Sequence, residues 1–187
     1  MKKLFLLAAA LLITAGAFAQ NQPQFGVKGG LNLASESGDD GGSTESRVGV
    51  HLGFFMETQI ARMVDFQPEL LYSTQGGESQ GVLDKFDYIN VPLMFKFYTG
   101  QARRFSIDAG PQLGYLISAK YIDDGDAVNI YDHDGLKKFD ASLGVGVSYK
   151  FNGGFDIGIR FLAGMTKMYE GLENKNSVVQ IGAGYRF

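Results

Sequence analysis

The sequence predicts an all-β fold: an eight-stranded antiparallel up-and-down transmembrane β-barrel that follows a cleaved signal peptide. Three observations lead to this prediction. Apolar residues recur at every second position in eight segments, the connections between these segments alternate between short and long, and the bulky apolar side chains share one face of each segment. No segment after the N-terminal leader shows a convincing helical period.

The first 19 residues have the parts of a secretory signal peptide. Lys2 and Lys3 precede an apolar run over residues 4–13, and Ala17 and Ala19 follow in an A-x-A arrangement. The run is shorter than the roughly 20 apolar residues that a spanning helix needs. We therefore expect a signal peptide at 1–19, cleavage after Ala19, and a single domain at 20–187.

The composition suits an exported chain that is not stabilised by disulfides. The chain has 26 glycines and no cysteine, and its formal net charge is −3. An exported protein without cysteine must be held together by other interactions. The mild acidity argues against a nucleic-acid partner, which requires a clustered basic surface.

Eight segments alternate bulky apolar residues with polar or small ones, as strands with two different faces do. In chain order they cover residues 24–34, 47–58, 64–73, 88–98, 105–120, 139–151, 155–165 and 179–187. Their bulky series run from Phe25 to Leu33, Val48 to Met56, Val64 to Tyr72, Ile89 to Phe97, Phe105 to Ile117, Phe139 to Phe151, Phe155 to Met165 and Val179 to Phe187.

The connections alternate in length along the chain. Short ones fall near 59–62, 99–103 and 152–154, and the last carries an Asn-Gly hairpin signal; long ones fall near 36–46, 76–84, 121–136 and 169–176. Transmembrane barrels have short periplasmic turns and long outer loops. With an even number of strands, both termini are expected on the periplasmic side.

The bulky face is expected to point to lipid. Its Phe, Tyr, Leu and Ile side chains are together too large for the narrow interior of an eight-stranded barrel, whereas the Gly, Ser, Asn and charged residues of the other face would fill that interior. Aromatic residues also lie where interfacial girdles form. The ten residues from Phe105 to Tyr115 span about 25 Å at a tilt of ~40°, the height of the apolar band.

The inward face is predicted to carry charges of both signs. It includes the cations Lys28, Lys96, Lys120, Lys150, Arg160 and Arg186, and the carboxylates Glu57, Glu69, Asp108, Asp140 and Asp156. A lone charge in so confined a space is costly, so pairing is expected. We expect an ion-paired polar plug, with a narrow ion-selective path as the alternative.

The chain resembles the porin-family outer-membrane β-barrel proteins of Gram-negative bacteria. The resemblance rests on "FGVKGGLNLA", "FQPELLYSTQGG", "YINVPLMFKFY", "DAGPQLGYLISAK", "KKFDASLGVGVSY" and the final "GAGYRF". It implies an eight-stranded barrel in the outer membrane, surrounded by lipid, with no shared catalytic residues. We expect a monomer without cofactors.

The C-terminus resembles the signature that the β-barrel assembly machinery recognises. The terminal aromatic is Phe187, and apolar residues precede it at alternate positions: Val179, Ile181 and Tyr185, with the small Ala183 at the remaining position of the series. The resemblance implies that this machinery is a partner during biogenesis.

The sequence does not favour a catalytic site or a metal site. His51, expected inside, and His133, in a loop, lack a serine at a telling spacing, so a lipid hydrolase is a distant alternative. The acidic loop from Asp123 to Asp134 offers oxygen ligands for calcium, at Asp123, Asp124, Asp126, Asp132 and Asp134, but no glutamate completes an EF-hand. We expect a solvated acidic loop and a non-enzymatic structural or surface-interaction protein, with a small porin as the alternative.

Overall fold

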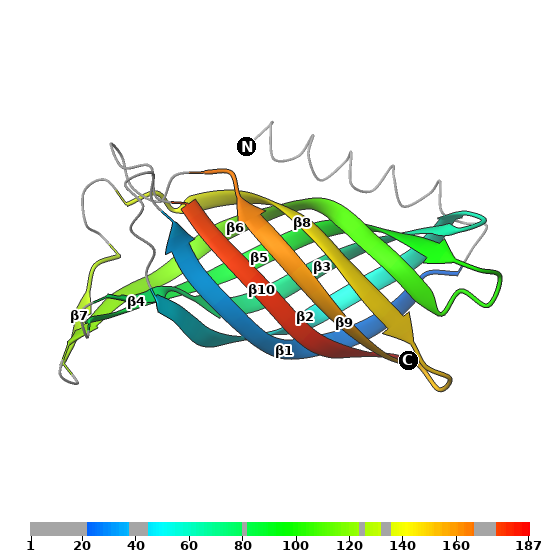
Figure 1. Cartoon of the computed structure of the whole chain (residues 1–187), viewed down its shortest axis with the longest axis horizontal. Helices are drawn as coiled ribbons and strands as arrows, with labels where there is room; N and C mark the ends of the chain where they lie inside the picture. The colour runs from blue at the N-terminus through cyan, green and yellow to red at the C-terminus, as the bar shows by residue number, and fades with distance from the viewer. Residues whose placement is uncertain (1–21, 38–44, 80–81, 124–125, 132–135, 167–174) are drawn as a thin grey trace, which may run out of the picture.

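The computed structural model describes residues 22–37, 45–79, 82–123, 126–131, 136–166 and 175–187 (Figure 1). The expected signal peptide lies outside these ranges, as do most of the first long loop and His133. Within the described residues, no helix has the length and apolarity that crossing a membrane requires.

The described chain forms a closed antiparallel barrel. Its strands are β1 (Gln24–Ser37), β2 (Glu45–Ala61), β3 (Val64–Gln75), β4 (Gly77–Ser79), β5 (Val82–Thr99), β6 (Phe105–Asp123), β7 (Asp126–Asn129), β8 (Phe139–Lys150), β9 (Phe155–Gly164) and β10 (Lys175–Arg186). Eight of these described strands are long, each pairs with its neighbours along the chain, and β10 pairs with β1 to close the barrel. The eight predicted segments are therefore confirmed.

Two short strands were not expected from the sequence. β4 pairs with both β2 and β5, and β7 pairs with the end of β6. Both lie at the end of the barrel opposite the C-terminus (Figure 1). There β5 and β6, of 18 and 19 residues, extend well beyond the 10-residue β9.

The bulky face points outward, as predicted. Exposed side chains include Phe54, Leu70, Tyr115 and Phe155, and Phe187 at the end of the chain is 74% exposed. An apolar surface that surrounds the whole barrel is far larger than a protein in water carries. It forms the outward apolar band of a transmembrane barrel.

The inward face is less polar than the sequence indicated. Large apolar side chains are also buried there: Phe55, Leu71, Met94, Leu116 and Leu162. Each directly follows an outward-facing apolar residue in the sequence, as in Phe54–Phe55 and Leu70–Leu71. Alternation cannot assign two adjacent apolar residues to opposite faces, so the pattern concealed these inward members.

The expected inward orientation of Lys120 is wrong. The pairing of β5 with β6 shifts by one residue, since Tyr88 pairs with Leu116 but Asp87 pairs with Ser118. Such an irregularity exchanges the two faces of a strand beyond it. As a result Ala119 is buried and Lys120 is exposed.

Candidate functional site: an ion-paired barrel interior

Charged side chains from every long strand of the described barrel meet in its interior. They are Lys28 on β1, Glu57 on β2, Asp65 and Glu69 on β3, Lys96 on β5, Asp108 on β6, Lys150 on β8, Asp156 and Arg160 on β9, and Arg186 on β10. All but Asp65 were expected there. Asp65 lies at an inward position, two residues before Gln67, so the same alternation would have identified it.

Glu69 is the centre of the first group of ion pairs, and its side chain has no exposed surface. Arg160 binds it through two hydrogen bonds, Nη2 to Oε1 at 2.8 Å and Nη1 to Oε2 at 3.1 Å. Lys28 Nζ lies 3.1 Å from both carboxylate oxygens, and Gln67 Nε2 donates to Oε1 at 2.8 Å. The two-fold contact of a guanidinium with a carboxylate is among the stronger hydrogen-bonded pairs.

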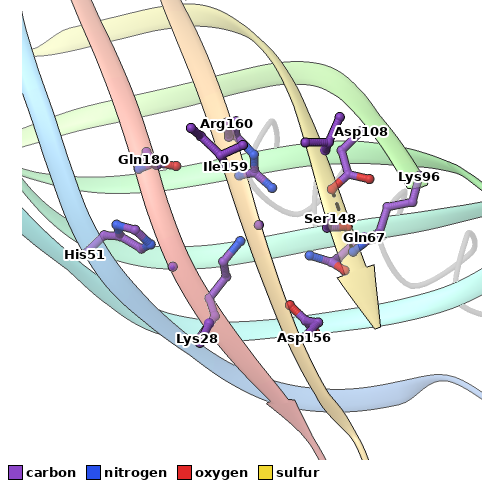
Figure 2. Close-up of a pocket in the computed structure, with 14 residues that line it drawn as sticks. Lys28, His51, Gln67, Lys96, Asp108, Ser148, Asp156, Ile159, Arg160 and Gln180 are labelled. Atoms are coloured by element: carbon purple, nitrogen blue, oxygen red, sulfur yellow. Dashed lines mark ion pairs between the residues drawn. The ribbon is translucent and has the colours of Figure 1, made fainter. Parts of the chain in front are cut away.

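A second ion pair joins β5 and β6. Lys96 Nζ is 3.8 Å from Asp108 Oδ2, the contact that Figure 2 marks with a dashed line. Ser106 Oγ donates to Asp108 Oδ1 at 2.6 Å and shares a hydrogen bond with Ser148 Oγ at 2.7 Å. These contacts tie β5, β6 and β8 together.

The third group lies at the short-turn end of the barrel. Glu57 accepts hydrogen bonds from Lys150, from Arg186 Nε at 3.2 Å and from the Tyr98 hydroxyl at 3.0 Å. Arg186 also pairs with Asp156.

Asp65 extends this group toward the turns. It pairs with Arg103 and lies 3.6 Å from Lys150 Nζ. Next to these pairs a polar cavity of about 250 Å³ is lined by Gln22, Gln24, Glu57, Gln59, Asp65, Arg103 and Lys150.

An uncharged network surrounds His51, which is buried as expected. Its Nδ1 lies 2.8 Å from Asn32 Oδ1, and Gln180 Nε2 donates to the same oxygen at 3.2 Å. The ring packs against Gly30 and Gly182, where an added Cβ would lie 2.9 Å from ring atoms. The neighbouring backbone lies closer still, since the Ile181 carbonyl oxygen would be 2.1 Å from a Cβ at Gly30 and the Gly29 carbonyl oxygen 2.8 Å from one at Gly182. Both the close approach of the strands and the histidine ring therefore require glycine at these positions.

Little space remains in the middle of the barrel, around Lys28, His51 and Arg160. The cavity in Figure 2 has a volume of about 30 Å³ and is lined by Lys28, His51, Gln67, Asp108, Arg160 and Gln180 among others. That volume has room for only a few water molecules.

Two clusters of buried apolar side chains lie toward the long loops. Phe86, Tyr88, Leu116 and Ala119 form one buried cluster with Ile130 and Leu136 of the β6–β8 connection. Ala34, Leu162 and Val178 form a second. Sequence alternation did not predict these clusters, because most of their members adjoin other apolar residues.

Asp140 differs from the other expected charges. It accepts a hydrogen bond from Thr166 and joins none of the ion pairs in the described part of the chain. The structure does not group three or more metal-ligating side chains among the residues it describes. Several aspartates of the acidic loop, for which a solvated state was expected, lie outside those residues.

The closed barrel, its apolar outer belt and its polar interior define the class of protein: a transmembrane β-barrel of the outer-membrane type. The chain belongs to the outer membrane protein beta-barrel domain family, whose sequence profile matches residues 18–170. It is accordingly an outer-membrane protein of Gram-negative bacteria.

Solved structures show the same fold at low sequence identity. The attachment invasion locus protein Ail of Yersinia pestis is 18% identical, with a TM-score of 0.56 over 89% of this chain and 99% of that one. Neisserial surface protein A is also 18% identical, with a TM-score of 0.58 over 87% and 97%. No curated protein sequence matches the chain.

Removing the central carboxylate tests the role of the ion pairs in stability. Glu69→Ala leaves Arg160 and Lys28 without their counter-ion in a buried site, which costs about 3–5 kcal/mol. We expect urea unfolding in lipid vesicles, followed by circular dichroism, to show a loss of that size. Asp126→Ala, at an exposed position on β7, is the control and should change the free energy of unfolding little. Equal unfolding midpoints for the two variants would contradict a stabilising role for the ion pairs of Glu69.

Proposed function

We propose that the protein is a non-enzymatic outer-membrane barrel that acts in envelope structure or surface interactions, with a lumen that side chains fill. The observation that carries the proposal is the network of ion pairs from all the long strands, which leaves a cavity of only about 30 Å³ in the middle of the barrel and a larger polar cavity only at the short-turn end of the described barrel. An interior of eight strands is just wide enough for its own side chains. The apolar clusters near the long loops add a layer that ions do not readily cross.

A surface role is supported by the proteins that share the fold. One is described as an attachment invasion locus protein and another as a surface protein, and Ail has been solved with the heparin analogue sucrose octasulfate. Two long connections of the present chain are acidic, with Asp39 and Asp40 in one and Asp124, Asp132 and Asp134 in another. We therefore propose a neutral or cationic surface ligand rather than a polyanion.

Conductance distinguishes the filled lumen from the alternative, a small porin. The refolded protein in a planar bilayer should give no channel steps in concentrated potassium chloride. Glu69→Gln should also stay silent, because the apolar clusters remain. Stable steps that change with Lys96→Ala would establish a pore and overturn the filled lumen.

The orientation we propose places the short turns and both termini in the periplasm. The chain has no cysteine, so single cysteines can report on each end. On intact cells, a membrane-impermeant maleimide should label Val128→Cys on β7 and should miss Ala102→Cys in the β5–β6 turn. Permeabilised cells should show both labels, and the reverse pattern on intact cells would invert the orientation.

We propose that Val179, Ile181, Tyr185 and Phe187 are read by the β-barrel assembly machinery. Changing both Tyr185 and Phe187 to serine removes two outward rings, each worth about 1.5–3 kcal/mol. The matched control changes Tyr115 and Phe139, a paired and similarly exposed Tyr and Phe, to serine.

Both double variants should fold similarly into lipid vesicles without the machinery. In cells, the C-terminal variant should be depleted from the outer-membrane fraction much more strongly than the control. Equal amounts of the two variants in that fraction would show that these rings act through stability alone.

A further inference from the structure

The outer wall of the barrel contains an apolar groove of about 530 Å³ that crosses β8, β9 and β10. Figure 1 shows these strands side by side on the near face. The lining side chains are Phe105, Val147, Tyr149, Ile157, Ile159, Ile181 and Ala183, with Ser148, Gly158 and Gly182 beneath them. Ligand pockets are typically about 300–1,000 Å³ in volume.

The groove exists because small residues interrupt the outward face. One row of paired residues runs Phe105, Tyr149, Ile157, Ala183 and continues to Gly29 on β1. Ala183 contributes only a methyl group, whereas Ile157 and Ile181 stand exposed beside it. The groove does not continue over Gly29, where an added Cβ would lie 3.1 Å from Leu52 Cδ1. The hollow is about 14 Å long, from three interstrand spacings of about 4.8 Å.

The groove runs from the short-turn end obliquely into the membrane. Phe105 is the first residue of β6, whereas Ala183 lies further from the end of its strand, which is at Arg186. Its length and apolar lining suit a hydrocarbon chain.

A cationic side chain, that of Arg104, lies next to the short-turn end of the groove. Arg104 directly precedes Phe105, is exposed, and is held to β8 by a hydrogen bond from the Lys150 amide to its carbonyl (2.7 Å). Its Nη2 donates to Asn152 Oδ1 in the β8–β9 turn at 3.3 Å. A guanidinium has five N–H donors, so this one contact leaves donors for a phosphate oxygen.

We propose that this groove is a binding site for a diacyl glycerophospholipid. One acyl chain lies between Phe105 and Ala183, and the phosphodiester accepts hydrogen bonds from Arg104. Binding in detergent does not depend on which way the barrel faces. The assignment of this lipid to the periplasmic leaflet rests on the orientation proposed above, which the cysteine-labelling experiment tests separately.

The test separates recognition of the lipid phosphate from recognition of the acyl chain. The refolded protein is released from detergent in a mass spectrometer after incubation with phosphatidylglycerol or with diacylglycerol of the same acyl chains. Wild type should retain one phosphatidylglycerol, and about tenfold less diacylglycerol. Arg104→Gln should lower phosphatidylglycerol to the diacylglycerol level, and Ala183→Leu, which fills the hollow, should lower both.

Two matched variants serve as controls, and all variants are first shown to fold by their heat-modifiable gel migration. Arg62→Gln removes an exposed arginine from another short turn, and Ala109→Leu enlarges an outward alanine outside the groove. Both should bind as wild type does.

Three results would overturn the proposal. The first is equal retention of the two lipids by wild type, and the second is unchanged retention in Arg104→Gln and Ala183→Leu. The third is a lipid-free dimer that Ala183→Leu dissociates, which would assign the groove to a second copy of the chain.

Discussion

Glu69 is a carboxylate with no exposed side-chain surface in the middle of the barrel, and the interior is organised around its neutralisation. An ion removed from water is unfavourable unless its partners are well placed. Those partners, Arg160 and Lys28, come from β9 and β1, and Arg160 is far from Glu69 in the sequence. The two-fold contact with Arg160 therefore forms only when the barrel is closed, so closure and this ion pair depend on each other.

The environments of the two faces explain why the contacts that hold distant strands together lie in the interior. The outward apolar belt faces lipid, where side chains gain little by associating with one another. Backbone groups within the membrane must then be satisfied within the sheet, which the unbroken ring of strand pairs provides. Inside, hydrogen bonds and ion pairs join walls that the sheet connects only through intervening strands, as Glu57 does between β2, β8 and β10.

The two ends of the barrel differ in the polarity of their buried side chains. Near the short turns, Glu57, Asp65 and their cationic partners border a polar cavity. Toward the long loops, an apolar cluster under β5 and β6 supports an extension that carries β7, with Val128 61% exposed. If the interior is filled as we propose, the long-loop end and the outer wall remain as the surfaces for interactions.

The sequence by itself determined the eight long strands, most of their faces and most of the charged interior. A strand with lipid on one side and a crowded lumen on the other must alternate, so Lys28, Glu69 and Arg160 were assigned inward from local pattern alone. The alternation could not assign the faces of a strand where two apolar residues are adjacent or where the strand pairing shifts by one residue. Adjacent apolar pairs concealed Leu71 and Met94, and the register shift in β6 reversed Lys120. Only the tertiary structure decided which carboxylate meets which cation, because those contacts cross the lumen between strands distant in sequence. It also decided that the small Ala183 lies in one row with Phe105, Tyr149 and Ile157 to hollow the outer wall, since only strand pairing brings these four residues together.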